Sequence, residues 1–180
     1  MKTWEDIQGW FNYEAIYDMM LERCAPGGTI VEIGVWKGRS LAYMAKIIQK
    51  QKPGIKLYGV DTFVGSREMW AGGVPMPSFY EEVKKNLTDC GTPTELLNML
   101  SVQAATLFKN KTVDSVFVDG SHETQDVLND IDAWLPKIKP GGILAGHDYT
   151  TTVAMAVDAR FSKSDMILSY TGCWVYPVQT

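Results

Sequence analysis

Short apolar runs alternate with helix-period segments along almost the whole chain, and this alternation constrains the fold more than any other feature. Short runs that are expected to form strands occupy positions 29–35, 56–61, 96–100, 113–119 and 143–148. Between them, apolar residues recur at helical spacing, as in Leu41, Met44, Ala45 and Ile48. Strands that alternate with amphipathic helices are typical of a parallel sheet covered on both faces. The sequence therefore predicts one doubly wound, mostly parallel, Rossmann-like α/β domain over residues 1–180, with a closing antiparallel hairpin at 166–170 and 173–177.

Capping and breaking residues predict where the main elements begin and end. Ser40 is placed to cap the helix that follows the first strand. A second helix is expected over about 78–89, and a third around Val127 and Ile131 ends before the Pro140-Gly141-Gly142 breaker. The fifth strand is then expected to begin at Ile143. The third helix also carries three carboxylates, which are most simply a solvated face: Asp126, Asp130 and Asp132.

Composition and charge favour a small-molecule partner. A net charge of −4 offers no basic footprint for a nucleic-acid backbone, and no stretch approaches the roughly 20 apolar residues of a membrane span. The start of the chain has acidic residues where a signal peptide needs a basic and then an apolar segment. Cys24, Cys90 and Cys173 show no CxxC spacing, which is typical of buried, reduced thiols. We therefore expect a cytoplasmic protein without nucleic-acid or membrane partners, and the oligomeric state is left open.

The loop after the first strand has the pattern Glu32-x-Gly34-x-x-x-Gly38. Its two glycines allow a sharp turn and a close approach of a ligand to a helix N-terminus. Trp36 stands where a dinucleotide-binding fold needs a glycine, and the spacing does not fit a P-loop, so a phosphate cradle is disfavoured. Glu32 would repel pyrophosphate but suits a cation such as a sulfonium compound. Asp61 ends the second strand, where it can accept hydrogen bonds from a ribose diol; the simpler alternative is a connecting loop with Asp61 in a cap.

Polar residues collect at the ends of the later strands as well. Asp119 ends the fourth strand, and His147 and Asp148 end the fifth. His122, the other of the two histidines, lies just past the fourth strand. Ligands bind outside the carboxyl ends of the strands in sheets of this type, so one site along one sheet edge is predicted. A histidine can act as a base near neutral pH, although a structural role is the alternative for His122, His147 and Asp119.

These motifs resemble those of class I S-adenosylmethionine-dependent methyltransferases. The Glu32–Gly38 pattern with Asp61 is similar to their first two motifs. The segments 118–122, 139–143 and 147–149 are similar to a subgroup with D-G-x-H and H-D-Y signatures, related to catechol O-methyltransferase, macrocin O-methyltransferase and cephalosporin hydroxylase-like proteins. The resemblance implies that S-adenosylmethionine binds with its methionine end at the glycine loop, its ribose at Asp61 and its adenine near the third strand. The implied cofactor-binding residues are Glu32, Gly34, Val35, Trp36, Gly38, Ser40, Asp61, Thr62, Phe63, Ser101, Val102, Asp119 and His122.

The same resemblance implies a catalytic group of Asp119, His122, His147 and Asp148. In the catechol-type relatives, three residues at these strand ends hold a divalent metal, and Asp119, His147 and Asp148 occupy the matching positions. His147 stands where those relatives carry an acidic residue, and imidazole adds little to a magnesium site. Three options stay open: a softer ion such as manganese, a two-carboxylate magnesium site completed by water, or no metal with His122 or His147 as base.

The sequence as a whole predicts a transferase that methylates the oxygen of a small hydroxylated acceptor. The alternatives are a metal-dependent hydroxylase-like enzyme on the same scaffold and a nucleoside-binding protein without turnover. Residues 63–77 are too long for a simple connection and are expected to form a lid, with Arg67, Met69 and Trp70 as candidate wall residues. The aromatic run 10–13 is expected either to pack over the site or to extend the core.

Overall fold

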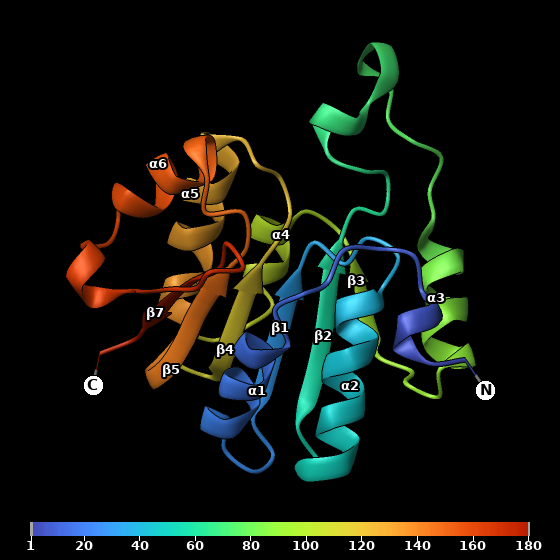
Figure 1. Ribbon diagram of the computed structural model, residues 1–180, viewed down its shortest axis with the longest axis horizontal. Coiled ribbons are helices and arrows are strands. Elements are labelled where there is room, and N and C mark those ends of the chain that lie inside the picture. Colours follow the sequence, from blue (N-terminus) through green and yellow to red (C-terminus); the bar gives the residue numbers. More distant parts are fainter. Residues whose placement is uncertain (1, 180) are drawn as a thin grey trace.

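The computed structural model describes residues 2–179, which form a seven-stranded sheet with helices on both faces (Figure 1). The order of the strands is β3-β2-β1-β4-β5-β7-β6. Neighbouring strands from β3 to β5 pair in parallel, and β7 pairs antiparallel with both β5 and β6. The strands are β1 (Thr29–Ile33), β2 (Lys56–Asp61), β3 (Glu95–Asn98), β4 (Val113–Val118), β5 (Ile138–Gly146), β6 (Ile167–Leu168) and β7 (Trp174–Pro177).

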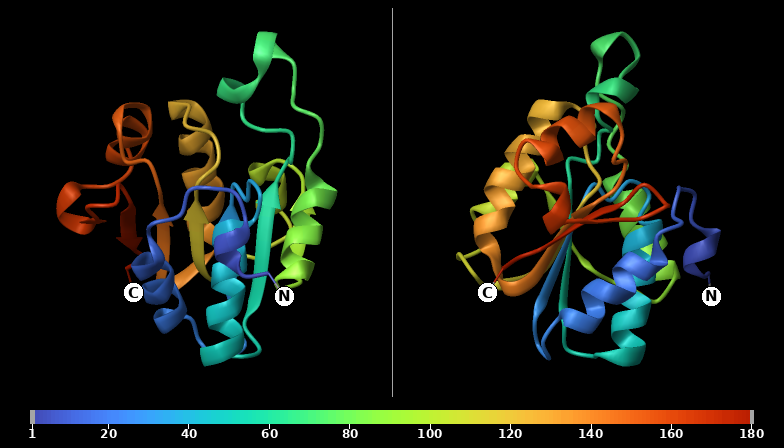
Figure 2. Two further views of the ribbon diagram at one scale, coloured as in Figure 1. Left: turned by 45° about the vertical axis from the view of Figure 1, so that its right-hand side comes forward. Right: turned by 60° about the vertical axis from the view of Figure 1, so that its left-hand side comes forward.

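Three α-helices cover each face of the sheet, as the right-hand view of Figure 2 shows with the sheet nearly edge-on. One face carries α1 (Glu14–Arg23), α2 (Arg39–Gln51) and α3 (Tyr80–Asp89). The other carries α4 (Ser101–Ala105), α5 (Thr124–Trp134) and α6 (Thr151–Asp158). Short 3-10 turns complete the chain: η1 (Trp4–Asp6), η2 (Arg67–Met69), η3 (Ala71–Gly73), η4 (Leu135–Lys137) and η5 (Lys163–Asp165).

The central strand β4 shows why the sheet is covered on both faces. All six of its residues are buried, because side chains that alternate between the two faces meet a helical layer on either side. Val116 and Val118 pack with α5 residues such as Ile131, whereas Phe117 packs with Tyr17 and Met20 of α1. The predicted doubly wound sheet with a C-terminal antiparallel hairpin is therefore confirmed.

Three local predictions are wrong, each because of a contact between distant elements. Gly38, not Ser40, is the N-cap of α2, and the Ser40 hydroxyl donates to Glu32 instead. Strand β5 begins at Ile138, because Gly142, whose Cβ would lie 2.3 Å from the Asp114 carbonyl oxygen, lets the chain stay extended beside β4. Asp130 is not solvated: it is 8% exposed in the layer formed by α4, α5 and α6, and burial raises its pKa to about 6.

The structure adds helices α1, α4 and α6, which the sequence analysis did not predict, and agrees with the prediction for the thiols. Cys24, Cys90 and Cys173 are free and buried. Among residues 2–179, no helix is both long and apolar enough to cross a bilayer.

Two segments border the carboxyl edge of the sheet. The chain before α1 runs across this edge from the side of α3 to the side of α1, and the segment between β2 and α3 projects away from it (Figure 1). Arg39 at the start of α2 fastens the first segment by donating to the carbonyl oxygens of Ile7 and Gly9, each at 3.3 Å. Two segments that are far apart in the sequence, the chain before α1 and the segment between β2 and α3, therefore border the candidate site.

Candidate functional site

The glycine loop between β1 and α2 touches the end of β4 through main-chain atoms. The N–H of Gly34 donates to the carbonyl oxygen of Val60 at 2.9 Å, and Gly34 has a φ of +83°. A Cβ at Gly34 would lie 1.9 Å from the carbonyl oxygen of Asp119. Only a glycine fits such a close approach, so the first glycine of the motif brings the loop against the strand end that carries Asp119.

Asp61 joins the glycine loop to the end of β2. One carboxylate oxygen accepts from the N–H groups of Val35 at 2.8 Å and Trp36 at 3.1 Å, and the other accepts from Phe63 at 2.7 Å. Burial raises the pKa of Asp61, and the backbone N–H groups of Phe63, Trp36, Val35 and Thr62 oppose that rise. Asp61 thus holds the glycine loop against the end of β2 without capping a helix, and ribose binding by the same partly exposed side chain stays a prediction.

Glu32 is directed into the protein and not into open solvent. Its side chain is 2% exposed, and its two oxygens accept from the hydroxyls of Ser40 at 2.7 Å and Tyr17 at 2.9 Å. Burial raises the pKa of Glu32 to about 8, and the two hydroxyl hydrogen bonds lower it only in part. Glu32 and Ser40 together tie β1 to the first turn of α2 beneath the glycine loop, and direct cofactor contact by Glu32 stays a prediction.

The raised pKa of Glu32 predicts a pH-dependent stability. The unfolded chain loses this proton near the ordinary value of 4.5 and the folded chain near 8, so the free energy of unfolding falls as pH rises between these values. In the Glu32→Gln variant we expect this decline to be smaller by an amount on the order of a few kcal/mol, since the amide does not ionise. Thermal unfolding of both proteins from about pH 5 to about pH 8 measures this difference. The same pH dependence of stability in both proteins would contradict the raised pKa of Glu32.

The residues expected around the adenosine have varied surroundings. Phe63 is fully buried and packs edge-on against Tyr80 at 5.0 Å between ring centroids, so its side chain belongs to the core. The Ser101 hydroxyl accepts from the indole N–H of Trp134 at 2.8 Å, whereas Val102 is 39% exposed. Trp36, also expected at the cofactor, stacks on the exposed ring of Trp10.

Four candidate catalytic side chains meet at the ends of β4 and β5. The nearest oxygen of Asp148 lies 3.0 Å from Nε2 of His122 and 3.2 Å from Nδ1 of His147. Nδ1 of His147 also lies 3.8 Å from Oδ1 of Asp119, and Nε2 lies 3.1 Å from the carbonyl oxygen of Thr171. The structure therefore brings Asp119, His122, His147 and Asp148 together, with the Asp148 carboxylate between the two imidazoles.

Burial and neighbouring charges shift the pKa values of Asp119, Asp148 and His147, and the two effects oppose each other. Burial raises the pKa of Asp119 to about 6, with a smaller contribution from Asp148, while the neighbouring His147 lowers it. The hydrogen bonds from His122 and His147 hold the pKa of Asp148 well below its ordinary value. Burial would lower the pKa of His147, but Asp148 and Asp119 outweigh it and the net shift is upward. Because the Thr171 carbonyl can only accept, His147 carries a proton on Nε2.

Among the described residues, three side chains have the spacing of a metal-binding group. Asp119, His122 and Asp148 each offer a ligand atom, and these atoms lie within 4.8 Å of one another. The family resemblance assigns His147 to the metal, whereas the structure brings His122 into the group and turns Nε2 of His147 toward Thr171. A small cavity adjoins this group, and its wall includes Val127, Val153 and Trp174.

Tyr13 is a site residue that the sequence analysis did not identify. It lies directly before α1, is 3% exposed, and donates its phenolic hydrogen to Oδ2 of Asp119 at 2.8 Å. Its ring lies 4.7 Å from that of His147, measured between centroids. The aromatic run 10–13 was the only signal, and nothing in its spacing singles out one hydroxyl.

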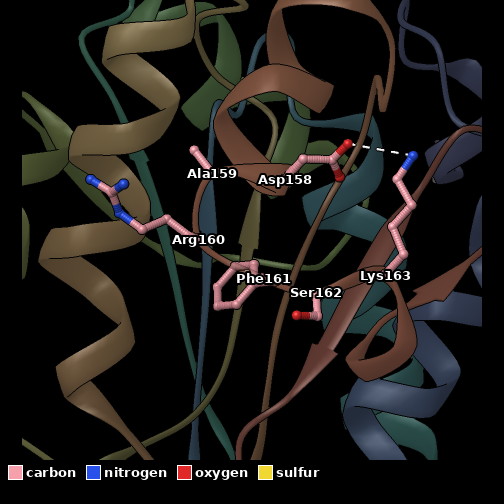
Figure 3. A pocket seen from close by; sticks show the side chains of 6 residues that line it. All are labelled: Asp158, Ala159, Arg160, Phe161, Ser162 and Lys163. Atoms are coloured by element: carbon pink, nitrogen blue, oxygen red, sulfur yellow. Dashed lines mark ion pairs between the residues drawn. The ribbon is translucent and has the colours of Figure 1, made fainter.

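A second depression lies apart from these strand ends, at the turn after α6 (Figure 3). It is lined by the consecutive residues 158–163, and Asp158 and Lys163 form an ion pair across it at 3.5 Å. None of the candidate catalytic or cofactor-binding residues lines it, so it is not a candidate for the same chemistry.

Comparison with known proteins agrees with this geometry. The profile of a methyltransferase domain family matches residues 31–149, which include the glycine loop and the ends of β4 and β5. A curated relative, the uncharacterized protein y4gI of Sinorhizobium fredii, is 26% identical over 119 residues, which are 66% of this chain. The aligned region is 13% of the length of that relative.

Solved structures share the fold. The O-methyltransferase NovP superposes with a TM-score of 0.73 at 18% identity, over 92% of this chain and 79% of that one. An rRNA methylase from Streptococcus thermophilus superposes with a TM-score of 0.65 at 13% identity, over 96% of this chain and 99% of that one. The fold is thus common to enzymes named for different acceptors, and it does not by itself exclude nucleic acid. The family match shows that the chain, with its Rossmann-like sheet, belongs to the methyltransferase domain family.

Proposed function

We propose that this domain transfers the methyl group of S-adenosylmethionine to the oxygen of a small hydroxylated acceptor. The observation that carries the proposal is the group of Asp119, His122 and Asp148, whose ligand atoms lie within 4.8 Å of one another beside the glycine loop. Methyl transfer is an in-line displacement, so the acceptor oxygen has to be held near the sulfonium and lose its proton. S-adenosylmethionine supplies the methyl group and leaves as S-adenosylhomocysteine.

The loop residues would hold the cofactor mainly through their main chain. Gly34 and Gly38 give the backbone its close approach, and Asp61 fixes the loop through Val35 and Trp36. Thr62, Ser101 and Val102 lie at the next two strand ends and support an adenosine site there.

The ligand atoms of the candidate metal-binding group, Asp119, His122 and Asp148, fit a divalent cation. Two carboxylates and an imidazole suit manganese or iron better than magnesium, because magnesium gains little from nitrogen ligands. The raised pKa of the buried Asp119 indicates that its negative charge lacks full compensation, which a cation would supply. Asp119, Asp148 and His122 would hold the ion, and a bound ion would lower the pKa of a coordinated acceptor hydroxyl.

Transfer without a metal would use His122 as the base. Asp148 accepts from Nε2 of His122 at 3.0 Å and so orients the imidazole, as in other paired bases. His147 is less suited to this role, since its pKa is raised and it carries a proton toward Thr171.

The acceptor would enter between the glycine loop and the projecting segment 63–77, which we propose as a lid. Within this segment, the indole N–H of Trp70 lies 2.9 Å from the carbonyl oxygen of Val64, which gives the projection an internal hydrogen bond. Arg67 and Met69 are exposed on it and are candidates for contacts to the acceptor. The net charge of −4 favours a small acceptor over RNA.

Titration calorimetry with S-adenosylmethionine and S-adenosylhomocysteine tests the cofactor, with NAD as control and with or without Mg²⁺ or Mn²⁺. We expect micromolar binding of the two sulfur compounds, no binding of NAD, and tighter binding in Mn²⁺ than in Mg²⁺. Transfer of labelled methyl groups is then compared among catechols, sugars and RNA. Absence of binding by both sulfur compounds would refute the proposal, and label in RNA would refute the small acceptor alone.

A further inference from the structure

The phenol of Tyr13, in the segment before α1, contacts the candidate metal-binding group. It donates to Oδ2 of Asp119 at 2.8 Å, an ordinary distance for a hydrogen bond from a hydroxyl to an oxygen. A phenol carries its proton at neutral pH, so Tyr13 is the donor and the carboxylate of Asp119 the acceptor. The other oxygen of Asp119, Oδ1, is the one that faces His147.

Packing fixes the Tyr13 ring independently of this hydrogen bond. The ring stacks on Phe117 of β4 at 5.0 Å between centroids, and Phe11 meets it edge-on at 4.8 Å. On its other side the ring lies 4.7 Å from His147. A rigid ring held by β4 and β5 can therefore set the rotation of the Asp119 carboxylate to which its hydroxyl is bonded.

We propose that Tyr13 is a positioning residue that holds the carboxylate of Asp119 in the orientation needed to bind a divalent cation. Tyr13 binds Oδ2 and leaves Oδ1 on the side of His147, whose Nδ1 lies 3.8 Å away. Partners of this kind orient a metal ligand without touching the ion, and their loss typically weakens metal binding by about 10- to 100-fold. This inference rests on the metal site proposed above, and it gives the N-terminal segment a role in the chemistry.

Tyr17 provides a matched control. It is another buried tyrosine of the same region, it packs on the same Phe117 at 4.9 Å between centroids, and its hydroxyl also donates to a buried carboxylate. That carboxylate is Glu32, which is not among the three residues of the candidate metal-binding group. The Tyr13→Phe and Tyr17→Phe variants thus remove the same chemical group from similar surroundings, and only the first removes a bond to Asp119.

The experiment is calorimetric titration of the purified chain with Mn²⁺ alone, with thermal unfolding to confirm that each variant folds. We expect Tyr13→Phe to weaken Mn²⁺ binding by about 10- to 100-fold, Tyr17→Phe to leave it within about twofold, and Asp119→Ala to abolish it. Equal affinities of Tyr13→Phe and the unaltered protein would overturn the inference, as would equal weakening in both tyrosine variants.

Cofactor titration separates the outcomes. If the unaltered protein binds S-adenosylmethionine but no Mn²⁺, the metal site and the role of Tyr13 fall while methyl transfer stands. If Mn²⁺ binding depends on Tyr13 but the cofactor does not bind, the inference stands and the proposed methyl transfer falls.

Discussion

Replacement of Asp61 by alanine is expected to weaken S-adenosylmethionine binding by about 100-fold or more. Three backbone N–H groups, those of Val35, Trp36 and Phe63, lose their shared acceptor in this variant. A buried donor left without a partner destabilises the folded form by about 1–3 kcal/mol, and about 1.4 kcal/mol corresponds to a tenfold change in affinity. The glycine loop would then sample other conformations before binding, in addition to any loss of ribose contacts. Calorimetric titration of the variant measures the change.

Asp114→Ala is the control that separates loop order from general stability. Asp114 is buried, pairs with Lys139 at 2.7 Å, and accepts from two backbone N–H groups, those of Ala25 at 3.2 Å and Thr29 at 2.8 Å. Asp114 lies near the amino end of β4, whereas the candidate site is at the carboxyl ends of the strands. Its loss is therefore expected to lower the unfolding temperature without changing cofactor affinity. Unchanged binding in Asp61→Ala, or equal weakening in both variants, would contradict the role assigned to Asp61.

Replacement of Gly34 by alanine is expected to lower the free energy of unfolding by more than about 3 kcal/mol. The new methyl group would lie 1.9 Å from the carbonyl oxygen of Asp119 and 2.7 Å from the backbone nitrogen of Gly120. These are main-chain atoms that cannot move aside as a flexible side chain can. The left-handed backbone adds strain of about 1–2 kcal/mol, and overpacking adds about 1–3 kcal/mol or more. Denaturant unfolding of the variant measures the loss.

Gly54→Ala carries the same kind of backbone strain without the collision. Gly54 has a φ of +101°, and no atom lies within 4 Å of the position its Cβ would take. We expect a loss of about 1–2 kcal/mol there, from the strain alone. Comparable losses in the two variants would show that Gly34 is needed for its backbone angle and not for the contact between the glycine loop and β4.

The alternation of apolar runs and helical periods was sufficient to predict the sheet. Strand β2 begins and ends where the sequence pattern put it, because the Pro53-Gly54 breaker precedes it and the polar Asp61 ends it. Strand β5 was predicted to begin five residues too late, at Ile143 instead of Ile138, since Pro140 and two glycines look like a turn until β4 is beside them. Helix α1 was missed, although Ile16, Tyr17, Met20 and Leu21 form its buried face.

The sequence also determined that the polar strand ends would share one edge. Parallel strands have their carboxyl ends on the same side, so Asp61, Asp119 and Asp148 had to gather there once the fold was known. The common direction of the parallel strands is enough to predict this gathering, without knowledge of any side-chain contact.

The tertiary structure decided which of these side chains touch. It placed Asp148 between His122 and His147, gave Glu32 to Tyr17 and Ser40, and brought the hydroxyl of Tyr13 to Asp119, a residue 106 positions away. Such contacts depend on how two separate elements pack and on which rotamer each side chain adopts, and neither is encoded in a local pattern. The sequence by itself determined where the site would be, and the packing of distant elements determined which atoms face one another within it.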